Sequence, residues 1–251
     1  MATRVANRKP SYSNQARTTN QAHTFYSYWD WSRDAKDYNS TDMGIFQTEI
    51  FSELGMGGNG PYIANTPDPF GTARFGRTCG GCVDTDPFQR PNISINVNGT
   101  EPGACLKRDM IPFLINWWGQ RSLVEEVLSQ PDFTSFARAL EGNPTFEAPN
   151  IHGSGHFGTG GTTSQIGNAY NSPAGALCSS PFLSRAFKLT ESSLDPLFYL
   201  HHGNLDHITW LWQQQDPATR LYQVGGNVIP FAWGSSPNVT LDFEVDMGVG
   251  A

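Results

Sequence analysis

The chain has 251 residues and a formal net charge of −7, with 38% hydrophobic, 12% aromatic and 16% charged residues. This length is enough for one large domain or two small ones, and the acidic balance lacks the clustered cations that nucleic-acid binding requires. No apolar run approaches the roughly 20 residues that a membrane-spanning helix needs. Composition therefore excludes nucleic-acid-binding and membrane-spanning classes, and it predicts a loop-rich protein with an aromatic core.

The N-terminal stretch carries basic residues without any apolar run, and the first acidic residue of the chain is Asp30. It lacks the apolar segment of a secretory signal. We expect a disordered or misassigned lead over residues 1–24, followed by one domain over residues 25–251. Secretion is nevertheless suggested by the cysteines and by four glycosylation sequons. The sequons lie at Asn39, Asn92, Asn98 and Asn238.

The cysteines leave two interpretations open. Cys79-x-x-Cys82 is half of a zinc-ribbon pattern, but a second pair is missing and Cys178 stands alone. A loop disulfide, with Cys82 paired to Cys105, is therefore favoured over a metal site.

An aromatic block, Phe25 to Trp31, follows the lead and precedes a stretch dense in Gly, Pro, Asn and Thr from about Gly55 to Gly103. This stretch predicts a long, ordered loop, because its aromatic side chains give it something to bury. Those aromatic residues include Tyr62, Phe70, Phe75 and Phe88.

Helical patterns occupy the second half of the chain. Apolar spacing predicts one helix around residues 123–128 and a second that begins after Pro131 and ends at Gly142. The longest predicted helix begins at Asp195-Pro196 and ends before Asp216-Pro217, and its broad apolar surface predicts burial. The tail offers only short β-like runs. The fold class is therefore mainly α, with long Gly/Pro-rich loops and little β.

Two histidine clusters carry the candidate chemistry. His152-Gly-Ser-Gly-His156 puts two imidazoles on one face if this segment is helical, although two glycines disfavour a helix. In the longest predicted helix, His202 and Asp206 are likewise four residues apart. Three imidazoles from two elements are a typical copper or zinc ligand set, and a nearby carboxylate can orient them. Taken alone, the first pair could be incidental, and the second cluster could be a core histidine bonded to a carboxylate.

Other catalytic signatures are missing from the sequence. It has no Gly-x-Ser-x-Gly elbow, no phosphate-binding Gly-x4-Gly-Lys loop and no His-Glu-x-x-His. A zinc hydrolase with three histidines and an open water position is a further class. It is disfavoured because no general base is identifiable beside the histidines.

The segment Asp195-Pro-Leu-Phe-Tyr-Leu-His-His-Gly-Asn-Leu-Asp206, followed by Trp210 and Trp212-Gln213, resembles the second copper-binding motif of tyrosinases, catechol oxidases and molluscan haemocyanins. The segment His152-x3-His156 resembles the upstream half of the same copper site. Tyr28-Trp-Asp-Trp31 resembles the block that follows the first copper site in this family. The resemblance implies a helical bundle of the tyrosinase type.

The resemblance also implies the ligand set and the reaction. The copper ligands would be His152, His156 and His202. His201 would either support these ligands or pack in the core, and Asp206 would brace the site. Family members hold two copper ions, with three histidines each, and use dioxygen to oxidise small phenols or catechols to quinones. Gly153 replaces an amide that some monooxygenating members carry, which favours diphenol oxidation.

The first copper site departs from the family pattern. Its three histidines lie upstream of the Tyr-Trp-Asp-Trp block in the family, where this chain has only His23. We therefore expect one copper ion, at the second site, and a domain truncated upstream. An impaired relative that binds a single copper ion is the alternative to an active oxidase. A partner chain that supplies the missing ligands is a variant of the active form.

Overall fold

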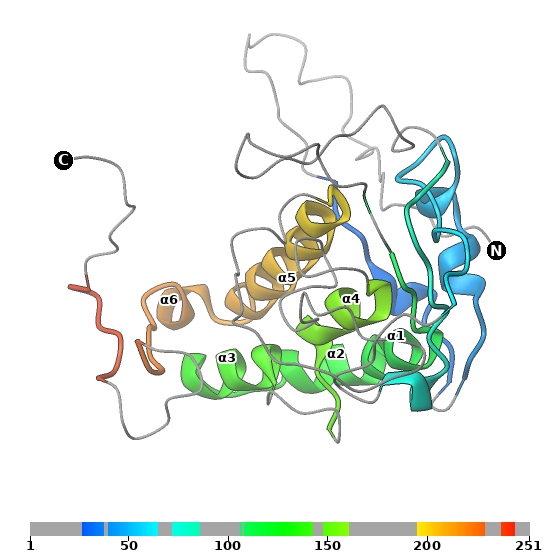
Figure 1. Ribbon diagram of the computed structural model, residues 1–251. Helices are drawn as coiled ribbons and strands as arrows, with labels where there is room; N and C mark the ends of the chain where they lie inside the picture. The colour runs from blue at the N-terminus through cyan, green and yellow to red at the C-terminus, as the bar shows by residue number, and fades with distance from the viewer. Residues whose placement is uncertain are drawn as a thin grey trace, which may run out of the picture.

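The computed structural model (Figure 1) describes residues 27–37, 40–64, 72–85, 106, 108–142, 148–160, 195–228 and 237–243. These residues contain helices and two isolated β-bridges, Tyr62–Gly80 and Asn227–Asn238, but no strand. The mainly helical class with little β is confirmed. The predicted boundary between the 1–24 lead and the 25–251 domain lies outside the described residues and stays a prediction. No helix in this part of the chain has the length and apolar character to cross a membrane.

The helices follow one another from the middle of the chain onward (Figure 1). They are α1 (Pro112–Trp118), α2 (Arg121–Leu128), α3 (Phe133–Glu141), α4 (Ile151–Thr159), α5 (Leu197–Gln213) and α6 (Pro217–Arg220). The earlier residues form the short 3-10 helices η2 (Trp31–Arg33), η3 (Gly44–Gln47), η4 (Glu49–Phe51) and η5 (Thr72–Phe75).

The predicted helices are confirmed, and their ends have local causes. The Asp132 carboxylate accepts a hydrogen bond from the Ser135 N–H and caps α3, whereas Gly142 ends it with a φ of 68°. Helix α5 covers the predicted stretch, but Tyr199 and Trp210 are 61% and 52% exposed. The prediction of an entirely buried helix was therefore wrong for this face.

Helix α4 forms despite its glycines, because close packing requires them. A Cβ at Gly158 would lie 2.6 Å from Ile115 Cβ of α1, and one at Gly155 would lie 2.3 Å from His201 Nδ1 of α5. The Asn150 side chain accepts a hydrogen bond from the Gly153 N–H at the start of the helix. Each glycine costs about 1 kcal/mol of helix propensity relative to alanine. The contacts with α1 and α5 outweigh this cost.

The core lies where α5 packs against the aromatic block and the short helices α2 and α3. The Trp29 backbone N–H donates to the Leu200 carbonyl at 2.9 Å, which holds the block along α5. Trp212 stacks on Phe136 with centroids 4.7 Å apart, and both side chains are buried. This packing holds α5 through its buried face, whereas Tyr199 and Trp210 lie on its exposed face.

The long loop is only partly as expected. Phe75 stacks on Phe113 with centroids 5.3 Å apart, but Tyr62 is 70% exposed, so its predicted burial was wrong. Cys79 and Cys82 are both disulfide-bonded, which supports disulfides over a zinc site. Cys105 and Cys178 lie outside the described residues, so the Cys82–Cys105 pairing stays a prediction.

A buried ion pair anchors the beginning of α5. Arg108 Nε and Nη2 each donate to the Asp195 carboxylate at 2.9 Å, and both side chains are 0% exposed. Asp195 Oδ1 also accepts from the Leu197 N–H at 2.9 Å, and Arg108 Nη1 donates to the Gly57 carbonyl. The pair therefore joins the loop around Gly57 to the first residue of the helix that carries His202.

We expect Arg108→Ala to lower the free energy of unfolding by about 3–5 kcal/mol, because it leaves the Asp195 carboxylate buried without its partner. Urea denaturation followed by circular dichroism measures this loss. Arg121→Ala is the matched control, since its ion pair with Glu125 is 80% and 64% exposed. The control is expected to change stability by less than ~1 kcal/mol. Equal losses in the two variants would contradict the anchoring role.

Candidate metal centre

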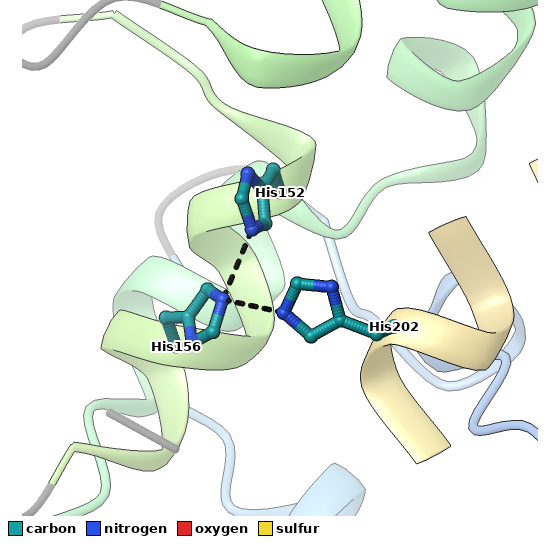
Figure 2. A group of neighbouring side chains, drawn as sticks. All are labelled: His152, His156 and His202. Carbon is teal, nitrogen blue, oxygen red and sulfur yellow. Dashed lines mark hydrogen bonds between the residues drawn. The ribbon is translucent and has the colours of Figure 1, made fainter. Parts of the chain in front are cut away.

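Three imidazoles from two helices meet at one point. His152 and His156 lie one turn apart on α4, and His202 faces them from α5 (Figure 2). His156 Nε2 is 3.0 Å from His152 Nε2 and 3.2 Å from His202 Nε2. One ligand atom from each residue lies within 4.8 Å of the others. The three histidines that the sequence singles out are therefore adjacent in space.

A carboxylate fixes the proton on His152. Glu141 Oε2, from the last residue of α3, is 2.8 Å from His152 Nδ1. Because an ionised carboxylate can only accept, Nδ1 carries the hydrogen and Nε2 of the neutral ring keeps its lone pair. Desolvation raises the pKa of Glu141, but the hydrogen bond from His152 and the attraction of the neighbouring imidazoles, which acts when they are protonated, outweigh it and lower the pKa. Glu141 therefore stays ionised beside the cluster at neutral pH.

Glu141 was not among the site residues predicted from the sequence. It lies 11 residues before His152, at the end of α3, and belongs to no motif in the sequence. Its position at the end of a predicted helix, shortly before the first histidine, was the one available signal.

His202 is held in its neutral form. Burial, followed by repulsion from His152 when that ring is protonated, lowers the pKa of His202 from 6.5 to about 4, and Glu141 offsets part of this shift. A neutral imidazole is the form that binds a metal ion. The ring also packs on Phe198, with centroids 4.2 Å apart.

Two further residues of α5 differ in how the structure places them. His201 is fully buried, and its ring nitrogens contact the Trp31 indole and the His152 backbone carbonyl rather than the three converging nitrogens. Asp206 is exposed, and no hydrogen bond joins it to a histidine among the described residues. Asp206, the carboxylate expected to brace the site, is therefore turned to solvent by α5. Glu141 is the carboxylate that contacts the cluster.

His207, on the same helix, lies outside the cluster. Its ring stacks on Tyr28 at 4.6 Å and on Trp210 at 5.9 Å between centroids. His23 lies outside the described residues. Within the described part of the chain, the converging set is thus His152, His156 and His202.

The arrangement fits a small transition-metal ion. Two nitrogens bound at about 2.0 Å to one tetrahedral ion lie about 3.3 Å apart, close to the two Nε2 separations seen here. If all three neutral rings carry their hydrogen on Nδ1, as the Glu141 contact specifies for His152, the three Nε2 lone pairs converge on one point. A bound cation would satisfy all three. Imidazole ligands suit copper and zinc.

Comparison with known proteins identifies the family. Residues 11–215 match the family model described as the common central domain of tyrosinase. The chain belongs to the tyrosinase family. This family uses copper, and the match contains all three clustered histidines. The matched region starts at residue 11, inside the predicted 1–24 lead.

Several relatives are fungal proteins. The tyrosinase-like protein phomQ1 of Diaporthe leptostromiformis is 27% identical over 231 residues, which cover 85% of this chain and 47% of that protein. Tyrosinase P of Aspergillus terreus is 25% identical over 244 residues, covering 88% of this chain and 60% of that protein. The N-acetyl-6-hydroxytryptophan oxidase ivoB of Emericella nidulans is 25% identical over 249 residues, covering 88% and 62%. The chain thus spans about half to three fifths of these relatives.

A solved structure shares the fold. A polyphenol oxidase from Thermothelomyces thermophila superposes with a TM-score of 0.55 at 23% identity, over 82% of this chain and 54% of that one. The tyrosinase-type helical fold implied by the sequence motifs is therefore confirmed.

The lowered pKa of His202 gives the copper-depleted protein a definite pH dependence. The unfolded chain binds a proton at this residue near pH 6.5, whereas the folded chain does so only near pH 4. The stability that neutral His202 contributes is therefore complete above about pH 6.5 and is lost as the pH falls toward 4. We expect urea midpoints to decrease across this window, and to decrease less in His202→Gln. Identical pH profiles for the two proteins would contradict the lowered pKa.

Proposed function

We propose that this chain binds one copper ion through Nε2 of His152, His156 and His202. The observation that carries the proposal is the convergence of these nitrogens in a member of a copper-using family. Glu141 would orient His152 through its Nδ1–H, and the low pKa of His202 would keep its lone pair available at neutral pH.

We further propose that the reaction served by this site is oxidation of a small phenol, with a catechol as the favoured substrate and dioxygen as the oxidant. Bound copper would supply the electron exchange with dioxygen, and the chain would supply the ligands and their orientation. A Cβ at Gly153 would lie 3.0 Å from Trp118 Cζ3 and 3.1 Å from Phe157 Cδ2, so an amide side chain has little room there. The missing amide at Gly153 supports diphenol oxidation over monooxygenation.

The number of histidines distinguishes two forms of the proposal. Six histidines are present; three form the cluster, while His201 and His207 are engaged elsewhere. This chain alone therefore offers one set of three converging imidazoles within its described part. An oxidase with a copper pair requires a second set from another segment or chain. A relative that binds a single copper ion without turnover requires no second set of histidines.

Copper loading followed by elemental analysis tests the ligand set. We expect about one copper ion per chain, and its loss in His156→Ala, because His156 Nε2 is the atom that both other rings approach. His207→Ala is the matched control, since this ring lies on α5 but outside the cluster, and it should retain copper. Zinc in place of copper, or equal copper in all three proteins, would contradict the proposal.

Oxygen uptake with a catechol tests the reaction separately. Uptake that rises with copper loading and disappears in His156→Ala would support an active oxidase. A flat trace at every copper level, with one ion bound, would exclude turnover by this chain and favour the single-copper relative.

The Glu141–His152 contact predicts a change in metal affinity. In Glu141→Gln the amide oxygen can still accept from Nδ1–H, but the charge that raises the basicity of the imidazole is lost. We expect copper to bind about 10-fold more weakly. Competition with a chelator of known affinity measures the change. Glu126→Gln, an exposed carboxylate on α2, is the control and should bind copper normally.

A further inference from the structure

His201 uses both of its ring nitrogens in contacts with groups other than the three converging nitrogens. The Trp31 indole Nε1–H donates to His201 Nδ1 at 3.0 Å, and His201 Nε2 lies 2.8 Å from the carbonyl oxygen of His152. An indole N–H can only donate and a carbonyl oxygen can only accept. These partners therefore specify one neutral tautomer, with the hydrogen on Nε2. The ring is 0% exposed.

The ring fills the space left by a glycine of α4. A Cβ at Gly155 would lie 2.3 Å from His201 Nδ1 and 2.6 Å from His201 Cε1. No residue other than glycine fits at position 155 without moving this ring. The distance between α4 and α5 is thus set at the level of the cluster by an imidazole lying against helix backbone.

These contacts bear directly on two of the three clustered histidines. His201 bonds to the main chain of His152, in the first turn of α4, and precedes His202 in α5. The His152 and His201 rings lie nearly parallel, at 21° with centroids 5.8 Å apart. A displacement of His201 would therefore move the backbone that carries His152 relative to the backbone that carries His202.

We propose that His201 is a positioning residue: the chain of hydrogen bonds from Trp31 through His201 to the His152 carbonyl sets the spacing of α4 and α5 at which the three Nε2 atoms converge. This inference rests on the proposed metal site. It assigns part of the metal affinity to Trp31 and Gly155, neither of which offers a ligand to the ion.

Cobalt(II) titration tests the proposal, because the ligand-field absorption of this ion reports coordination geometry without any need for turnover. His201→Phe keeps an aromatic ring but removes both hydrogen bonds, and Trp31→Phe removes only the donor to Nδ1. We expect cobalt affinity to fall at least about 10-fold in His201→Phe, with altered visible bands, and to fall less in Trp31→Phe. Gly155→Ala should resemble His201→Phe, since its methyl group displaces the ring.

Two controls separate positioning from core filling. Ile208→Ala creates a cavity beneath α5, where Ile208 is 3% exposed, and it should lower stability while leaving cobalt affinity and bands unchanged. His201→Gln should recover part of the affinity relative to His201→Phe, because its amide can donate to the His152 carbonyl. Near-ultraviolet circular dichroism identifies the variants that fold.

The outcomes distinguish the two levels of the proposal. Wild-type affinity and bands in folded Trp31→Phe and His201→Phe would overturn the positioning role while leaving the metal site intact. Loss of the cobalt bands in Ile208→Ala to the same extent would also overturn it, because any loosening of α5 would then suffice. A wild-type chain that binds neither copper nor cobalt would overturn the proposed function, and this inference with it.

Discussion

The close approach of α4 and α5 is the constraint on which the histidine cluster depends. Two of the three imidazoles come from one helix and the third from the other, so the cluster exists only at one spacing and one rotation of the pair. Gly155 permits that spacing by leaving room for the His201 ring. The ion pair between Arg108 and Asp195 holds the beginning of α5 from a separate segment. Packing and buried charge thus act together on one helix.

Fixed proton positions are the second principle of this region. The Glu141 carboxylate places the hydrogen of His152 on Nδ1, whereas the Trp31 indole places that of His201 on Nε2. Two neighbouring imidazoles therefore adopt opposite tautomers, each specified by a partner that can act in only one way. The His152 ring keeps a lone pair directed at the cluster, whereas both nitrogens of the His201 ring are hydrogen-bonded, one of them to the His152 backbone. The same residue type thus serves two purposes within a few ångströms.

The sequence revealed what depends on local spacing and on long motifs. Histidines four residues apart lie on one helix face, and the Asp195–Asp206 segment matched a specific family pattern, so the three clustered residues were found in advance. The same spacing argument offered Asp206 as the carboxylate that orients the ligands, but its side chain is exposed. Periodicity does not tell whether a neighbouring element covers a helix face. Glu141 and Trp31 join the region through the tertiary fold. Helix propensity opposed α4, and only its packing partners explain why it forms.

The composition of α4 also has a consequence for the order of events during folding. A nine-residue segment with three internal glycines, Gly153, Gly155 and Gly158, has negligible helicity in isolation, since short helices are marginal in water even for alanine-rich chains. His152 and His156 therefore come to share a face only after α4 docks between α1 and α5. The nascent chain offers no preformed chelating pair, and premature capture of a metal by these two residues is disfavoured until the surrounding tertiary structure is in place.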